Sequence, residues 1–275
     1  MNTVADAPRK GAFGDMNDWL NALVAHRVSA ARSAATPMSA ELAWIAENPG
    51  HTIYQRRSLF VVGVALAIIV GGMAATPGIL PLALSLVGLY FYVDFYSGIL
   101  HVVLDNPRFV RLPLIGIPCA EFQWHHALPY DISTRRLVHV FGDINALVLG
   151  KIVALVLLAG VTRMTVMVTA VGFFWAYVNQ YAHRSAHQAA AKRPPFTRWL
   201  QRHGVLVTPA VHHEHHTTHD RSFPVLSGRS RHLVQGLLRL VPNQWVWLTV
   251  FGVLTVVDLV AFARFMTWLA PRLPH

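Results

Sequence analysis

The sequence predicts an all-α integral membrane protein with four to five transmembrane helices and a histidine-rich cap on the cytoplasmic side. Three observations lead to this fold class. Apolar residues make up 54% of the 275 positions and charged residues only 13%, about half of the charged share of ordinary globular domains. Five apolar stretches are long enough to cross a bilayer, and most of the histidines gather at the ends of these stretches. This composition argues against a disordered chain and against an ordinary water-soluble globule.

Each apolar stretch has roughly the 17 to 25 residues that a helix needs to cross about 30 Å of hydrocarbon. The stretches are Ser58–Ala75, Ile79–Leu100, Ile144–Thr162, Met164–Ala182 and Trp245–Ala263. Thr76-Pro77-Gly78 separates the first two and little more than Arg163 separates the next two, so both pairs are predicted to be tight helical hairpins. The fifth stretch contains Asp258, and two interpretations of it stay open: a fifth span, or a helix lying partly in the interface.

The distribution of positive charge predicts the orientation of these spans. Two hairpins in series place residues 1–57, 101–143 and 183–243 on one side of the membrane, where they hold 6, 4 and 9 Lys and Arg residues, 19 of the 23 in the chain. By the positive-inside rule that side is cytoplasmic, and the net charge of +10 suits an anionic membrane surface. The basic residues form no stripe with interleaved aromatic residues, so no nucleic acid is expected as a partner.

Three regions follow from this pattern: a cytoplasmic N-terminal segment (1–57), a membrane domain with the histidine motifs (58–243) and a C-terminal hydrophobic helix and tail (244–275). Asp15–Ala34 in the first region fits an amphipathic helix on the membrane surface or, equally, a loosely ordered tail. The first apolar stretch follows some 57 residues and is not trailed by a small-residue cleavage site, unlike a signal peptide. One cysteine, Cys119, excludes an internal disulfide and a cysteine-based metal site.

Histidine is the residue whose distribution departs most from chance. Eight of the 16 histidines lie in residues 183–219, where a random scatter would place about two. The spacings i, i+3 and i, i+4 recur within the set, and on a helix these spacings place side chains on one face. The candidate ligands are His101 with Asp105, the pair His125-His126, His183 with His187, and His212, His215 and His216.

Eight imidazoles exceed the needs of one zinc ion, which takes four ligands, and suit two metal ions. Imidazole binds zinc, copper, iron and nickel alike. With one cysteine and few clustered carboxylates, a non-haem iron pair with mostly neutral nitrogen ligands is favoured. His213 is a further candidate ligand. Asp105, Asp131, Glu214 and Asp220 are expected to orient histidine N–H groups or to complete the ligand set.

The other histidines have a plainer interpretation, because a lone histidine is more often a structural or interfacial residue than a ligand. This interpretation applies to His26, His51, His203, His232 and His275. His139 and His219 each flank a cluster, and both interpretations stay open for them.

A metal centre at the cytoplasmic ends of membrane helices suits a lipid chain held against the metals. Removal of hydrogen from an unactivated C–H bond is beyond protein side chains and needs metal and oxygen chemistry, while the protein fixes the position of the chain. No flavin or nicotinamide fingerprint is present. O2 and two electrons from an external donor are therefore expected.

The motifs also resemble those of a known family. The segment Asp94 to His101 (DFYSGILH), followed by Asp105-Asn106, resembles the D-x-x-S-G-x-x-H-x-x-x-D-N block of the plasmanylethanolamine desaturase family of membrane lipid desaturases. Phe122–His126 with Pro129, Ile132 and Arg135-Arg136 is similar to its second block, and the two later histidine motifs are similar to its third and fourth. The likeness runs from about residue 85 to 230 in family order.

This resemblance implies an integral membrane di-iron enzyme that uses O2 and an electron carrier, cytochrome b5-like or ferredoxin-like, to dehydrogenate a phospholipid chain. In the best-known branch the product is the vinyl ether of plasmalogens. The metal ligands that it implies are His101, His125, His126, His183, His187, His212, His215 and His216, with Asp105 at the acidic position of the first block and His213 as a less central member.

One spacing departs from the vinyl-ether branch. That branch usually has H-H-x-x-H-H as its last block, whereas the segment from His212 to His216 (HHEHH) is one residue shorter and closer to the plastid branch, which desaturates an acyl chain of phosphatidylglycerol. This change leaves the expected metal chemistry intact and leaves the substrate open. A plasmanylethanolamine desaturase that forms the plasmalogen vinyl ether stays the leading expectation, with a phospholipid fatty-acyl desaturase as the alternative. No transit-like leader is evident, which favours a bacterial inner membrane over a plastid membrane.

Other functions predict other patterns. A membrane lipid hydroxylase uses a similar histidine centre and is not separated from a desaturase by the residues alone. A metal transporter or sensor predicts ionisable ligands near the bilayer midplane, whereas the spans carry only Asp94, Lys151 and Asp258 as charged residues. A haem-binding electron carrier predicts paired histidines across facing spans, and such pairs are absent from the five apolar stretches.

Overall fold

The computed structural model describes residues 49–112, 115–127, 129 and 131–273. These residues form helices and turns and contain no strand, which confirms the all-α class. The predicted amphipathic segment Asp15–Ala34 lies outside the described residues. Five long helices coincide with the five predicted apolar stretches: α3 (Pro49–Ala74), α4 (Ile79–Leu104), α8 (Asn145–Leu158), α9 (Arg163–Ala186) and α13 (Gln244–Leu269).

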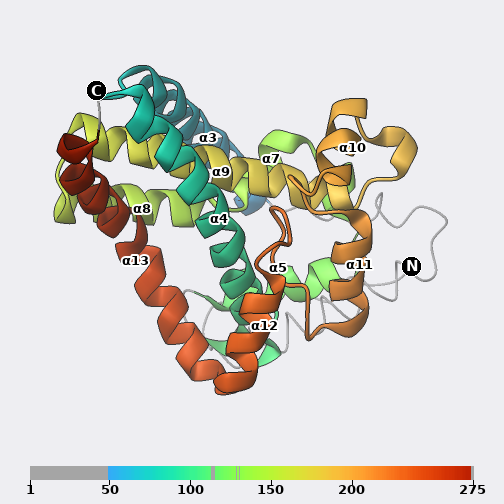
Figure 1. Ribbon diagram of the computed structural model, residues 1–275. Coiled ribbons are helices and arrows are strands. Elements are labelled where there is room, and N and C mark those ends of the chain that lie inside the picture. The colour runs from blue at the N-terminus through green and yellow to red at the C-terminus, as the bar shows by residue number, and fades with distance from the viewer. Residues whose placement is uncertain (1–48, 113–114, 128, 130, 274–275) are drawn as a thin grey trace, which may run out of the picture.

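Short helices make up the rest of the described chain. Between α4 and α8 lie η1 (Pro107–Arg111), α5 (Gly116–Ala127), α6 (Asp131–Thr134) and α7 (Leu137–Gly142). Between α9 and α13 lie η2 (Ala190–Lys192), α10 (Pro195–Arg202), α11 (Pro209–Thr218) and α12 (Arg231–Leu240), and η3 (Ala270–Arg272) follows α13. In Figure 1, α5, α10 and α11 lie at one end of the molecule, and the α8–α9 turn and the end of α13 lie at the other.

Helix α9 is the central helix of the bundle and contacts α3, α4, α8 and α13. Its buried residues Met167, Val168 and Val171 belong to one apolar core shared with those four helices. Where α3 crosses α9, a Cβ added at Gly72 would lie 2.5 Å from the Ala170 Cβ, so only glycine permits this approach. A small residue at a crossing lets two backbones come close, as in packed membrane helices.

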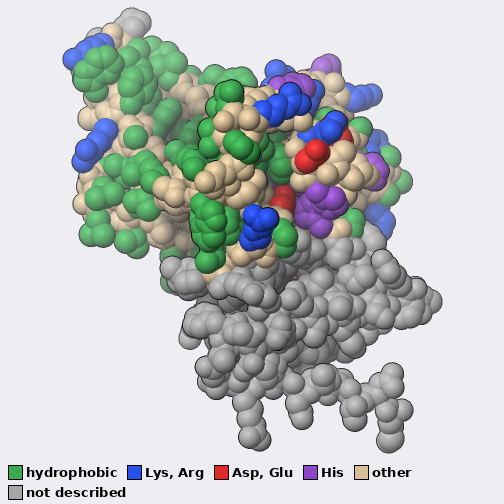
Figure 2. Space-filling view, turned by 90° about the horizontal axis from the view of Figure 1, so that it is seen from below, with side chains coloured by type: hydrophobic (Ala, Val, Ile, Leu, Met, Phe, Trp, Pro, Cys, Tyr) green, Lys and Arg blue, Asp and Glu red, His purple; other side chains and the backbone are tan. Residues whose placement is uncertain are grey.

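Large apolar side chains are exposed along the outer faces of these helices. Val70 on α3 is 72% exposed, Ile79 on α4 86% and Leu157 on α8 75%. Figure 2 shows hydrophobic side chains over the end of the molecule at the left of the view, with most of the visible His, Asp and Glu side chains towards the opposite end. Exposed apolar surface of this extent marks a membrane or protein contact.

Two helices of the described residues, Ile79–Leu104 and Gln244–Arg272, are long and apolar enough to cross a membrane. Helix α8 has 14 residues, or about 21 Å, which is shorter than the predicted Ile144–Thr162. Residues 159–162, which the prediction included in this stretch, form the turn between α8 and α9 instead. The two long apolar helices support association with a membrane, and the count of four to five spans remains a prediction.

Candidate metal centre

The first candidate ligand, His101, lies in the last turn of α4. Its Nδ1 is 2.8 Å from the Ser97 carbonyl oxygen. Because a carbonyl oxygen only accepts, Nδ1 carries the proton and Nε2 is left with its lone pair. Nε2 is buried and has no hydrogen-bond partner in the described structure. A buried, unprotonated nitrogen of this kind is what a metal ligand requires.

Three further elements bring the other histidine rings to the same place. Helix α9 ends with His183 in its last turn and His187 at its C-cap, and α5 carries His125 and His126 in its last turn. Helix α11 begins with Pro209 after the N-cap Thr208, whose hydroxyl accepts the Val211 N–H, and carries three of the predicted ligands in one turn. The ends of four separate helices therefore meet here.

Five of these imidazoles form one group, with ligand nitrogens that all lie within 4.8 Å of one another: His125, His183, His187, His212 and His216. The Nε2 atoms of His212 and His187 are 2.7 Å apart, and those of His183 and His125 are 2.9 Å apart. His216 Nε2 lies 3.1 Å from His212 Nε2. Several ring nitrogens aimed at one small volume form a site that can hold a cation.

These rings are neutral in the folded protein. Burial and, to a smaller extent, the neighbouring imidazoles together lower the pKa of His187 to about 3 and that of His216 to about 2. The same two causes hold the pKa of His125 and His212 well below the ordinary value. Neutral imidazoles keep the lone pairs that metal binding needs.

Asp105, His126 and His215 form a second group. Asp105 Oδ1 lies 2.9 Å from His126 Nε2, and its Oδ2 lies 3.2 Å from His215 Nε2. His215 Nδ1 donates to the Arg221 carbonyl oxygen at 3.0 Å, so Nε2 is the ring nitrogen that faces the carboxylate. A carboxylate oxygen and a ring nitrogen lie this close only with a proton or a cation between them.

The carboxyl group of Asp105 is ionised in this environment. Burial alone raises its pKa, but the imidazoles of His126 and His215 beside it outweigh burial and hold the pKa well below its usual range. The second group therefore combines one negative oxygen ligand with two nitrogens, whereas the first group has nitrogens alone.

His101 lies between the two groups. Its ring centroid is 5.6 Å from that of His183 in the first group and 5.6 Å from that of His215 in the second. His126 and His216 are also close across the groups, at 4.7 Å. The two groups are thus adjacent halves of one centre.

The structure separates ligands that the sequence motif placed together. His212 and His216 of α11 point into the first group, while His215 points into the second. His213 is exposed and belongs to neither group, because its side chain projects about 100° around the helix from its neighbour His212. The structure does not bring His213 to the centre, although the sequence made it a candidate ligand.

Among the acidic candidates, only Asp105 contacts a histidine in the described structure. Glu214 accepts a hydrogen bond from Ser222 Oγ at 2.6 Å, and Asp220 is exposed beside Arg221. The side chain of Asp131 lies outside the described residues. Of the histidines left open, His219 lies 4.8 Å from His126 by ring centroids, and His139 lies in α7. His203 packs against Trp199 at 4.7 Å.

Asp94 has a role that its place in the sequence motif did not predict. The carboxylate is fully buried and accepts the backbone N–H groups of Ser227 (2.6 Å), Gly228 (2.9 Å) and Ser230 (2.9 Å), and also Ser230 Oγ (2.7 Å). It therefore ties α4, which carries His101, to the segment that follows α11. A carboxylate within an apolar stretch is the signal that marks such an anchor.

Comparison with known proteins places this centre in a family. Residues 90–238 match the model of the lipid desaturase domain, and this range includes every histidine of both groups. The chain belongs to this family. The match covers more than half of the chain and runs from α4 to the last part of α12.

Curated relatives of this lipid desaturase domain come from Arabidopsis thaliana. "Fatty acid desaturase 4, chloroplastic" is 27% identical over 140 residues, which cover 50% of this chain and 43% of the relative. "Fatty acid desaturase 4-like 1, chloroplastic" is 27% identical over 161 residues, or 58% and 54% of the two chains. The chain thus spans about half the length of the curated relatives it matches. No solved structure matches it significantly.

Proposed function

We propose that this protein is an O2-dependent membrane lipid desaturase with two iron ions in its histidine centre. The observation that carries the proposal is the meeting of the two ligand groups where the ends of α4 and α9 come together with α5 and α11, within a lipid desaturase domain. The first ion is assigned to the five histidines of the first group. The second is assigned to Asp105, His126 and His215, with His101 available between them.

Iron bound here would supply the activation of O2 that abstraction of hydrogen from an unactivated C–H bond requires. The overall reaction takes two hydrogens from a –CH2–CH2– unit and, with two electrons and two protons from outside, reduces O2 to two molecules of water. An external one-electron carrier, cytochrome b5-like or ferredoxin-like, supplies the electrons. A phospholipid within the bilayer supplies the chain.

The residues of the protein shape the environment in which this occurs. His101, His212 and His215 are nearly inaccessible to water, and exclusion of water strengthens electrostatic interactions within the centre. The Ser97 and Arg221 carbonyl oxygens accept the Nδ1 protons of His101 and His215 and fix both rings with Nε2 facing inward. Both contacts are built from the same segments that Asp94 ties together.

An acyl chain of a phospholipid is the substrate that the comparisons favour. The relatives cited are named as fatty acid desaturases, and the compact histidine spacing from His212 to His216 agrees with an acyl substrate. The block from Asp94 to Asn106 favours the second candidate, conversion of an alkyl ether to the plasmalogen vinyl ether. For either substrate, the histidine centre is assigned to the cytoplasmic side of a bacterial inner membrane.

Lipid mass spectrometry separates these activities. The chain is expressed in a bacterium that lacks such an enzyme, supplied with alkyl-ether lipid, and the lipids are analysed with and without acid treatment. Loss of two mass units from an acid-stable acyl chain supports the acyl desaturase, and an acid-labile product two mass units lighter than the alkyl lipid supports the vinyl-ether enzyme. A gain of sixteen mass units indicates a hydroxylase. No change in the presence of a working electron donor contradicts the proposed function.

A further inference from the structure

We infer that the surface of α10 is the docking site for the acidic protein that delivers electrons to the centre. This inference rests on the proposed function, because a lipid desaturase of this kind needs an external reductant. The α10 surface consists of Lys192, Arg193, Arg198 and Arg202 together with Phe196 and Trp199.

The positive charge of this surface is not balanced by acidic residues nearby in the sequence. Residues 184–213 contain five Lys and Arg residues and no Asp or Glu. On α10, Phe196 is 66% exposed and Trp199 47% exposed, and their rings stack 5.9 Å apart. Exposed aromatic residues surrounded by arginines form the composition of a protein-binding hot spot, and a basic surface attracts and orients an acidic partner.

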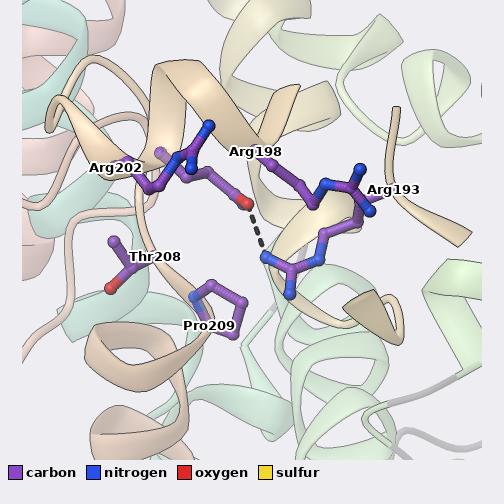
Figure 3. A pocket seen from close by; sticks show the side chains of 6 residues that line it. Arg193, Arg198, Arg202, Thr208 and Pro209 are labelled. Atoms are coloured by element: carbon purple, nitrogen blue, oxygen red, sulfur yellow. Dashed lines mark hydrogen bonds between the residues drawn. The ribbon is translucent and has the colours of Figure 1, made fainter. Parts of the chain in front are cut away.

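A pocket of about 300 Å³ lies within this surface, between α10 and the start of α11. Figure 3 shows Arg193, Arg198, Arg202, Thr208 and Pro209 around it, and Gln201 completes its lining. Guanidinium groups bind carboxylates with two parallel hydrogen bonds. The wall of the pocket is largely apolar, and the exposed Arg202 at its rim can pair with an Asp or Glu side chain of the partner.

Hydrogen bonds connect the α10 surface to the start of α11, which carries ligands of the metal centre. Gln201 accepts a hydrogen bond from Arg193 at 2.6 Å and donates one to the Val207 carbonyl oxygen at 3.0 Å. Val207 directly precedes Thr208, the N-cap of α11, and His212 follows Pro209 by three residues, or about 4.5 Å along the helix axis. A carrier docked here is thus held next to the helix that supplies ligands to both groups.

A membrane surface is the other partner that aromatic and basic residues suit. The position of α10 favours a protein instead. In Figure 1, α10 lies at the end of the molecule opposite the α8–α9 turn, beyond the C-terminal end of α9. The exposed apolar side chains of α3 and α8, such as Val70 and Leu157, lie on helices packed around α9 rather than on this surface.

The test compares two arginines, each in the last turn of a short amphipathic helix and each exposed: Arg202 of α10 and Arg239 of α12. Arg202→Glu and Arg239→Glu make the same charge change on two different surfaces. Full-length enzyme in neutral phosphatidylcholine nanodiscs is assayed with a reduced, acidic [2Fe–2S] ferredoxin, with the soluble domain of cytochrome b5, and with dithionite. Each carrier delivers one electron at a time and is oxidised as the centre is reduced.

With the carrier that supports turnover, Arg202→Glu is expected to raise KM for that carrier roughly tenfold at low salt, with little change in kcat. Higher salt should shrink the difference, because screening weakens the attraction. Turnover driven by dithionite should match the wild type, and Arg239→Glu should leave all three assays unchanged. Trp199→Ala, which alters no charge, should also raise KM for the carrier without changing the turnover driven by dithionite.

Three results would overturn the inference. Equal effects of Arg202→Glu and Arg239→Glu would show that the carrier responds to the overall charge of the protein and not to the α10 surface. Loss of the dithionite-driven reaction in Arg202→Glu would indicate damage to the centre. Unchanged use of both carriers, with weaker binding of the Arg202→Glu variant to anionic vesicles, would assign α10 to the membrane. If even the wild type desaturates no lipid, the proposed function fails. Direct binding of the two carriers to both variants then still tests the docking site.

Discussion

The imidazoles of the two groups should respond to substitution very differently from an exposed histidine. His183→Ala, His187→Ala, His215→Ala and His216→Ala each remove a nitrogen that faces the centre. Turnover should be abolished and bound iron should fall, while membrane insertion stays unchanged. Product analysis and iron content of the purified variants measure this, with exposed His232→Ala on α12 as the control. Full activity in the single variants would disprove the ligand assignment.

Asp105 allows the two halves of the centre to be tested separately. Asp105→Asn removes the negative charge from the second group and leaves the five histidines of the first group in place. Loss of such a ligand lowers metal affinity, typically by 10- to 100-fold even for a supporting residue. The iron content should therefore fall from two ions towards one per chain, as measured by elemental analysis after dialysis. Retention of both ions would place the second site elsewhere, and Asp220→Asn on the exposed surface is the matched control.

At the residue scale, the spacing of the histidines predicted which rings share a helix face but not which of the two groups each ring joins. His212 and His216, one turn apart, join one group as expected, whereas His215 between them joins the other. Whether His215 turns toward Asp105 depends on the Arg221 carbonyl oxygen, which orients its ring from a later turn. Such a tertiary contact leaves no mark in the local sequence pattern.

At the scale of the helices, a buried ion pair connects α8 to α13. Lys151 Nζ lies 2.6 Å from Asp258 Oδ2, which also accepts the Tyr92 hydroxyl of α4 at 2.8 Å. Lys151→Met leaves the carboxylate buried without its cation and should lower the free energy of unfolding by about 3–5 kcal/mol. Unfolding of the detergent-solubilised protein measures this effect.

The double variant provides the control for this prediction. Lys151→Met with Asp258→Leu removes both charges, so most of the lost stability should return, since a buried pair is readily replaced by apolar side chains. If the double variant is as unstable as the single one, the pair is not what holds α8 and α13 together. The same pair explains how a fifth apolar stretch that contains an aspartate packs within the bundle.

The apolar stretches predicted the long helices well and the short ones poorly. Each of the five stretches corresponds to a helix, because a run of apolar residues of this length has few other structures. Helices α5, α10, α11 and α12 were not predicted as elements, since they have 8 to 12 residues and depend on tertiary packing. The candidate site lies mostly on these short helices, so its geometry required the structure.

For the molecule as a whole, α9 is the helix on which the predicted orientation depends. It has 24 residues, or about 36 Å, yet among the described helices only α4 and α13 are both long and apolar enough for a span. Helices α3, α4, α8 and α13 surround α9, so its side chains face protein more than lipid and need less apolar character. If α9 crosses the membrane as predicted, its burial within the bundle accounts for its lower apolar content.

Cysteine labelling from the two sides of the membrane tests this orientation. Val161 precedes α9 and is 72% exposed, and Ala191 follows α9 and is also exposed. In a Cys119→Ala background, Val161→Cys should react with an impermeant maleimide in right-side-out vesicles, and Ala191→Cys only after permeabilisation. The reason is the positive-inside rule, which places the 19 Lys and Arg residues of the three loaded segments in the cytoplasm. The reverse pattern would put the metal centre outside the cytoplasm, and labelling of both sites from one side would show that α9 does not cross.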